Sequence, residues 1–167
     1  YSPTNGYENW INFLLDLKAE NIFKEIIPCI IINSEDDKLE ENLLLQVKSL
    51  KNHFSSIIYR SNIFDDNCYV DLELLKDELK KVNLFIIIDS EYVVQAAQHA
   101  YAIKVEARIA NLQKIINQSA KFILSATSFP NNISEIGNDS NDSFRLCEVE
   151  IFNYIMSTSN FPNNHDI

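Results

Sequence analysis

The sequence is short of glycine and of basic residues. It holds two glycines among 167 residues, so neither the G-x-G-x-x-G dinucleotide fingerprint nor a P-loop is present. Its 14 Lys and Arg stand against 24 Asp and Glu, a formal net charge of -10, and no stretch concentrates the basic side chains. The sequence therefore predicts no nucleic-acid partner and no docking on an anionic membrane surface.

Long apolar runs and cysteine motifs are missing as well. No apolar run approaches the ~20 residues that cross a bilayer, and the start does not read as a secretion signal, so we expect no membrane insertion. Cys29, Cys68 and Cys147 lack CxxC spacing, and the histidines lack metal-ligand spacing. We expect reduced thiols, a cytoplasmic location and no metal. Because the chain starts at Tyr1 and not at Met, we also expect it to be a piece of a longer protein.

Two segments about fifty residues apart share one plan. Residues 29–33 and 84–88 are short β-branched runs, and each is followed by small polar and acidic residues and then by a helical pattern. Further strands are predicted at 56–60 and 121–125, and a short fifth strand near 133 or 144. Apolar periodicity predicts helices at 7–25, 39–54, 72–82, 93–117 and 145–156. The pattern indicates an α/β fold, a flavodoxin-like open parallel sheet of four or five strands with helices on both faces.

The chain divides into three parts on this interpretation. Residues 1–27 form a helical lead-in that starts after an Asn5-Gly6 turn signal, 28–158 form the α/β domain, and 159–167 form an Asn-rich tail. Within the domain we expect a turn at 129–132 and a loop at 137–143.

The carboxyl ends of parallel strands meet at one edge of a sheet, where open α/β sheets bind ligands. Ser34, Glu35, Asp36 and Asp37 follow the first predicted strand, and Ser90, Glu91 and Tyr92 follow the third. We expect these groups to face one crevice. Backbone N–H groups at the two helix starts could hold a pyrophosphate there, although the acidic side chains oppose an anion. Alternatively, the two serines are helix caps.

Glu106 lies within the longest helical pattern, among Ala102, Ile103 and Ile109 at helical spacing. A partly desolvated carboxylate can carry a proton or stabilise a developing cation, as in glycosidic bond cleavage. The alternative is an ordinary solvated helix residue that pairs with Lys104 or lies beside Arg108.

These segments resemble the Toll/interleukin receptor (TIR) domains in their bacterial and divergent forms. Residues 30–38 look like the opening strand of that family, residues 84–92 look like its strand ending in Ser and Tyr, and Glu106 falls on the next helix, where the family places a glutamate. The loop of residues 63–69 looks like the family's BB loop. The resemblance covers residues 28 to about 157.

The resemblance implies two modes of action. In the first, the self-associated domain cleaves the nicotinamide glycosidic bond of NAD through Glu106, with NAD as substrate and no cofactor required. The pocket would be lined by Ser34, Glu35, Asp36, Ser90 and Tyr92.

In the second mode, the domain is a non-catalytic signalling module that binds other TIR-like domains. Its contact surface would be the loop that holds Ile63, Phe64, Asp65 and Tyr69. A third interpretation, a nucleoside deoxyribosyltransferase-like enzyme, shares the sheet architecture and would use a helix-borne glutamate as nucleophile.

Overall fold

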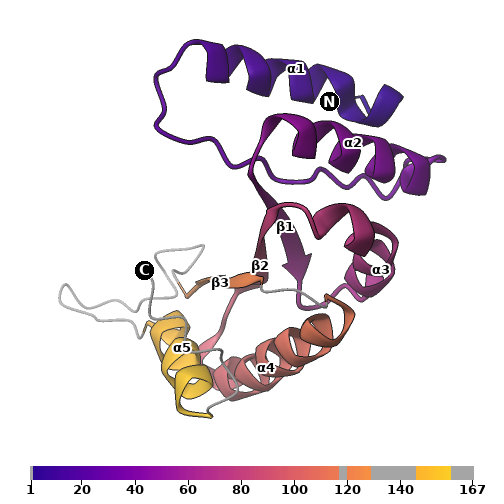
Figure 1. The fold of residues 1–167 in the computed structure, drawn as a ribbon. Coiled ribbons are helices and arrows are strands. Elements are labelled where there is room, and N and C mark those ends of the chain that lie inside the picture. The colour runs from indigo at the N-terminus through magenta and orange to yellow at the C-terminus, as the bar shows by residue number, and fades with distance from the viewer. Residues whose placement is uncertain (1, 117–119, 129–145, 159–167) are drawn as a thin grey trace.

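The computed structural model describes residues 2–116, 120–128 and 146–158, and its elements alternate between helix and strand (Figure 1). The strands are β1 (Ser56–Asn62), β2 (Asn83–Tyr92) and β3 (Lys121–Thr127). The helices are α1 (Thr4–Ala19), α2 (Leu39–His53), α3 (Asn67–Leu79), the 3-10 turn η1 (Gln95–Ala97), α4 (Gln98–Ile115) and α5 (Cys147–Ser157). The predicted α/β class is confirmed.

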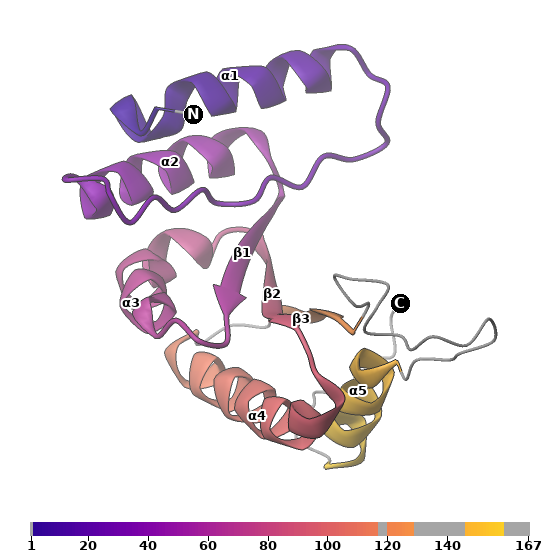
Figure 2. The same cartoon turned by 180° about the vertical axis from the view of Figure 1, so that it is seen from behind.

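The sheet is parallel and its strand order is β1-β2-β3, the same as the order along the chain. Each strand returns to the next through one helix, and such crossovers are right-handed. A sequential order therefore places all the connecting helices on one side of the sheet. Figures 1 and 2 show α2, α3, α4 and α5 following one another in an arc around the strands. The expected flavodoxin-like arrangement, with helices on both faces, is not found in the described chain.

The first predicted strand, 29–33, is reduced to an isolated bridge. Cys29 pairs with Ile58 of β1 through two backbone hydrogen bonds, from Ile30 N to Ile58 O at 2.9 Å and from Ile58 N to Pro28 O at 2.8 Å. The next residue, Ile31, bonds with its N–H and its C=O to the side-chain amide of Gln46 in α2. A side chain thus takes the place of a neighbouring strand. The described residues contain three strands, so the predicted four or five are not confirmed.

The N-terminal turn signal is confirmed. Asn5, Gly6 and Tyr7 all have positive φ, at the start of α1. Gly6 also approaches α2 closely, since a Cβ at this position would lie 2.6 Å from the Cβ of Leu45. Ile11 of α1 belongs to the same core as α2, although the predicted domain boundary at residue 27 stays a prediction.

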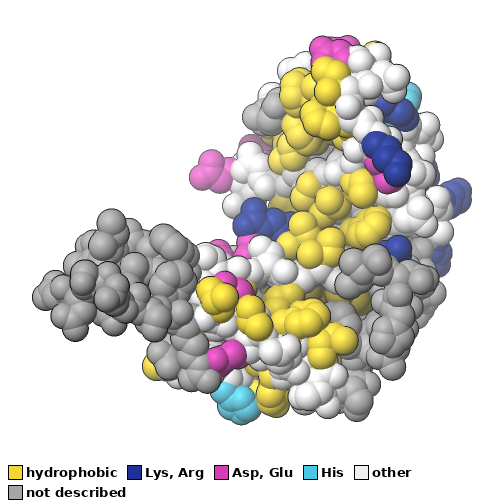
Figure 3. Space-filling view, turned by 90° about the vertical axis from the view of Figure 1, so that its left-hand side faces the viewer, with side chains coloured by type: hydrophobic (Ala, Val, Ile, Leu, Met, Phe, Trp, Pro, Cys, Tyr) yellow, Lys and Arg dark blue, Asp and Glu magenta, His cyan; other side chains and the backbone are white. Residues whose placement is uncertain are grey.

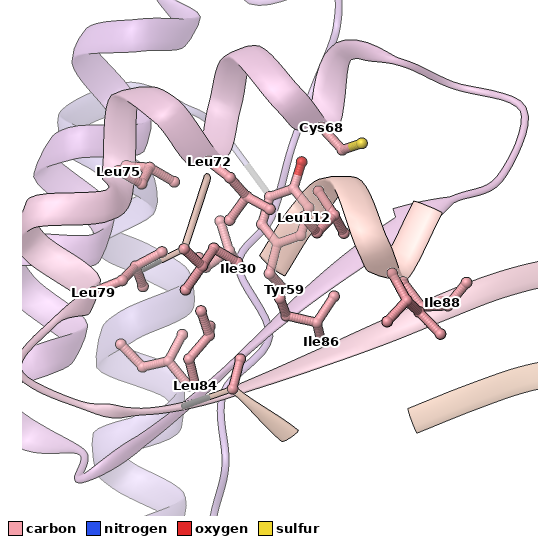
Figure 4. Packing of buried hydrophobic residues seen from close by; sticks show 14 of the residues in the cluster. Ile30, Tyr59, Cys68, Leu72, Leu75, Leu79, Leu84, Ile86, Ile88 and Leu112 are labelled. Carbon is pink, nitrogen blue, oxygen red and sulfur yellow. The ribbon is translucent and has the colours of Figure 1, made fainter. Parts of the chain in front are cut away.

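The core lies between the sheet and the helices. Alternate residues of β2, namely Leu84, Ile86 and Ile88, are at most 1% exposed and belong to one core cluster with side chains of α3 and α4 (Figure 4). The fully buried apolar side chains of β2 therefore lie on one side of the sheet only. The core residues of α3 are Leu72, Leu75 and Leu79.

No helix or strand among the described residues covers the opposite side of the sheet, which we call the open face. In-register neighbours form two rows across it, Ile58–Phe85–Lys121 and Arg60–Ile87–Ile123, and each of these residues is partly or largely exposed. Figure 3 views the side of the molecule at the left of Figure 1 and shows apolar side chains gathered in its middle with charged ones among them. The apolar side chains on this face are therefore only partly buried by the described residues.

Several predictions fall on residues 129–145 and 159–167, outside the described residues: the turn at 129–132, the loop at 137–143, the fifth strand and the tail. In the described part of the chain, no helix has the length and apolar character needed to span a bilayer.

Candidate functional site

Four polar residues lie at the carboxyl ends of β1 and β2, and we call them the rim cluster: Arg60, Asn62, Asp89 and Glu91. The register pairs Asn62 with Asp89, and Arg60 lies two residues before Asn62 on the same face. Ligand sites of parallel α/β folds lie at this end of the strands. The rim cluster is therefore the polar end of the open face.

Asp89 is the buried floor of the rim cluster, with 4% of its surface exposed. One of its carboxylate oxygens accepts hydrogen bonds from Nε of Arg60 at 2.7 Å and from an Nη of the same guanidinium. The other accepts the backbone N–H of Glu91 at 2.9 Å. The hydrogen bond and charge of Asp89 raise the pKa of Arg60, and the Cys29 and Glu91 charges add to this. The buried carboxylate thus has the partners that burial demands.

Glu91 has an unusual backbone. Its φ is +54°, a region that non-glycine residues rarely adopt, and it is held there by the bond of its N–H to Asp89. Its carboxylate accepts a hydrogen bond from the side-chain amide of Asn62, and the other end of that amide accepts the N–H of Phe64 at 2.8 Å. Strained residues of this kind gather at functional sites.

The predicted residues after the first strand lie elsewhere. Asp36 accepts the backbone N–H of Lys38 and the side-chain amide of Asn42 in α2, both at 2.9 Å. Asn42 in turn accepts the N–H of Gly6 at 3.0 Å. The turn that carries Ser34, Glu35 and Asp36 therefore packs with the starts of α1 and α2. The structure does not join it to the residues after β2.

The serines do not cap the helices that follow them. The N-cap position of α2 is Lys38 and that of α4 is Ala97, and neither helix has a side-chain cap bond. Ser90 lies inside β2 and is fully buried, and its Oγ has no hydrogen-bond partner among the described residues. The backbone carbonyl of Tyr92 accepts the hydroxyl of Tyr101 at 3.3 Å.

Glu106 is half-buried in the middle of α4. It stands eight residues after Gln98, about 12 Å along the helix axis from the start of α4. Its neighbours on α4 contact the loop after β1: Nζ of Lys104 lies 4.4 Å from the ring centroid of Phe64, and Arg108 donates to the carbonyl oxygens of Ile63 and Asp65. The meeting of Glu106 with the residues that follow the strands stays a prediction.

Arg108 of α4 holds the predicted interaction loop in place through hydrogen bonds. Arg108 is buried, with 4% of its surface exposed. The guanidinium donates to the carbonyl oxygens of Asp65 at 2.8 Å and Ile63 at 3.1 Å, and to the carboxylate of Asp66 at 2.8 Å. It also lies 4.6 Å from the ring centroid of Tyr69.

Only part of that loop is presented to solvent. Ile63 is buried and Tyr69 is half-buried, whereas Phe64 and Asp65 are exposed. Phe64 leans on α4, with its ring centroid 5.4 Å from that of Tyr101 and 4.4 Å from Nζ of Lys104.

Reasoning from the sequence placed Glu91 among the residues that face the crevice, but it singled out none of Arg60, Asn62 and Asp89. Arg60 was the last residue of a predicted strand, and Asp89 was the polar residue directly after another. Their position at strand ends was a usable signal, because the carboxyl ends of neighbouring parallel strands lie at one edge of the sheet. Among the described residues, no group of three His, Cys, Asp or Glu side chains is placed to hold a metal ion.

The fold and the rim cluster define a class: a singly wound parallel α/β domain with one covered face and a polar carboxyl end. The family model described as Beta protein matches residues 4–165, nearly the whole chain. The chain belongs to the Beta protein family. No curated protein and no solved structure matches it.

The family match overturns the resemblance to TIR domains. The interpretation as an NAD-cleaving or adaptor TIR domain is wrong, and the deoxyribosyltransferase-like alternative gains no support. The physical reason lies in the pattern used. A β-branched run that ends in polar residues and leads to a helix is common to all parallel α/β folds, and strand order distinguishes them. Doubly wound sheets reverse their strand order at a switch point, whereas this order is sequential.

Proposed function

We propose that this domain works by self-association, with the open face of one copy packed against the open face of a second, and that it does so in the cytoplasm. The observation that supports this proposal is that one side of the sheet has no covering layer among the described residues. Sheets bury their apolar face against another element, and contiguous exposed apolar surface marks interaction sites.

The middle of the open face is apolar. Ile87 and Phe85 of the central strand are half-buried, and Ile123 of β3 is 43% exposed. These residues lie side by side in the register, so they form one surface and not scattered spots. Burial of this surface against a second copy would remove it from water, and each Å² so buried contributes roughly 25 cal/mol before the costs of association.

The charges on the open face favour a second copy over an unrelated partner. A two-fold contact uses the same surface twice, so that surface must complement itself. The open face carries Arg60 and Lys121 together with the acidic Glu91 at its rim. A surface with both signs can pair with its own image, whereas a face of one sign would repel it.

The side of the sheet next to Cys29 is a poor place for association. Ile31 already bonds through its N–H and C=O to the amide of Gln46, which is fully buried. Proteins protect sheet edges in this way against pairing with another chain. Association through the face is therefore favoured over extension of the sheet at that edge. The three free cysteines among the described residues are compatible with a reducing compartment.

The experiment is sedimentation equilibrium of the chain over a wide concentration range, with Ile123→Glu as the test variant. We expect the parent to form dimers and Ile123→Glu to weaken the dimer at least tenfold, because it buries an unpaired carboxylate in the contact. The matched control is Ile103→Glu on the outer side of α4, where the isoleucine is 48% exposed. The control should dimerise as the parent does. A monomeric parent, or equal loss in both variants, would refute the proposal.

A further inference from the structure

The rim cluster holds two opposite charges that are close to each other but not directly paired. Arg60 forms its ion pair with Asp89, and no ion pair joins it to Glu91. Both residues nevertheless bond to the same carboxylate, Arg60 through its guanidinium and Glu91 through its backbone N–H, so they flank Asp89. Both side chains reach solvent at the carboxyl end of the sheet, and that of Arg60 is 64% exposed.

Both charges are held in position by the fold. Asp89 fixes the guanidinium through Nε and one Nη, so the direction of the remaining Nη is set by the buried carboxylate. Asn62 fixes one carboxylate oxygen of Glu91, and the left-handed backbone at Glu91 is fixed by the bond to Asp89. Groups positioned in this manner lose little freedom when a ligand binds.

Each charged group keeps capacity for a ligand. Arg60 has a second Nη that makes no hydrogen bond to the described residues, and a guanidinium can donate from all its nitrogens. Glu91 has a second carboxylate oxygen, and an ionised carboxylate accepts several hydrogen bonds. One donor group and one acceptor group therefore face the same end of the sheet.

The charge balance narrows the class of ligand. Arg60 contributes one positive charge, and Asp89 and Glu91 contribute two negative ones, which leaves the rim cluster with one net negative charge. A phosphate or other simple anion would meet this excess and the acidic character of the whole chain, net -10. A ligand that carries an ammonium together with its carboxylate would find a partner for each.

We propose that the rim cluster binds a zwitterion of the α-amino acid type, with its carboxylate on the free Nη of Arg60 and its ammonium on Glu91. The ion pair with Asp89 holds the guanidinium in place, and Asn62 holds the glutamate. This inference does not rest on self-association, because the four residues all belong to one copy. A ligand on Arg60 and Glu91 would compete with a second copy for the same charges.

The test titrates each of the twenty common L-amino acids into the isotope-labelled chain at neutral pH and detects binding by NMR. Acetate and methylammonium are titrated separately, because they represent the carboxylate and the ammonium of the ligand. We expect at least one amino acid to shift the amides of residues 60–62 and 89–91, and either half alone to bind at least tenfold more weakly. Glu91→Gln should weaken the amino acid at least tenfold, since the ammonium loses its charged partner.

The matched control is Glu35→Gln, an exposed acid in the turn that packs with α1 and α2, and it should bind as the parent does. Arg60→Lys is a second test variant that keeps a positive charge beside Asp89 but removes the free Nη, and it should also bind at least tenfold more weakly. Three outcomes would overturn the proposal: no amino acid binds, acetate binds as tightly as any amino acid, or Glu91→Gln and Arg60→Lys bind like the parent while folded.

Discussion

At the scale of single residues, Tyr59 and Asp71 form a hydrogen-bonded polar pair within the core. Tyr59 is 1% exposed, and its hydroxyl donates to the Asp71 carboxylate at 2.9 Å. Burial raises the pKa of Asp71, and the bond from Tyr59 lowers it only in part. Burial and the neighbouring acid also raise the pKa of Tyr59 far above its usual range, so the hydroxyl stays protonated. The pair thus buries a carboxylate whose charge is costly.

Asp71→Asn should therefore change how stability depends on pH. A carboxyl whose pKa is higher in the folded than in the unfolded state stabilises the fold below its unfolded pKa, near 4, and loses that contribution as pH rises through the folded pKa. Asparagine keeps an acceptor for Tyr59 without the charge. We expect the variant to lose this decline and, at pH 7, to match or exceed the parent by on the order of 1 kcal/mol, measured by urea unfolding from pH 4 to pH 7.

Tyr59→Phe is the control for that experiment. It removes the donor and leaves the buried Asp71 carboxylate without its partner, so it should destabilise the fold by about 1–3 kcal/mol at pH 7. If Asp71→Asn is less stable than the parent at pH 7, and its stability falls with rising pH as steeply as that of the parent, the buried Asp71 carboxylate is not the cause of that fall.

At the scale of elements, α4 and the loop after β1 are joined by one side chain. Arg108→Lys should destabilise the protein by about 2–4 kcal/mol, because an ammonium cannot satisfy the carbonyls of Ile63 and Asp65 and the Asp66 carboxylate from one buried position. Urea unfolding gives the free energy. Hydrogen exchange should show loss of protection in residues 63–68.

Lys114→Ala on the same helix serves as the control, because Lys114 is exposed and bonds only to the Asn111 side chain among the described residues. Its effect should stay within about 0.5 kcal/mol. An Arg108→Lys variant as stable as this control would show that the loop does not depend on the guanidinium.

At the scale of the whole molecule, stability should be greatest at the centre of the sheet. β2 pairs with a strand on both sides, and its inward side chains are at most 1% exposed, whereas β3 pairs only with β2 among the described residues. We expect the amides of residues 84–88 to exchange the slowest, near the free energy of global unfolding, and those of β3 to exchange through smaller openings. Exchange read by mass spectrometry over these two strands tests this. Slower exchange in β3 than in β2 would contradict it.

The local patterns predicted much of the fold. Short β-branched runs at 56–60, 84–88 and 121–125 are strands, and the apolar periodicity of the long segments places the helices, because both signals depend on the few residues next to each other. The run at 29–33 looked like the other strands in the sequence. In the structure, however, the side-chain amide of Gln46, fifteen residues after Ile31, bonds to the backbone N–H and C=O of Ile31 that a neighbouring strand would otherwise use. A contact of that kind leaves no mark in the local pattern.

The amino-acid sequence by itself determined the class of the fold, the parallel strands and the place of most helices, because these follow from side-chain size, branching and periodicity along the chain. Tertiary structure decided the strand order, the single covered face and the residues that meet at the rim. Arg60 and Asp89 are 29 residues apart and pair only because β1 and β2 lie in register.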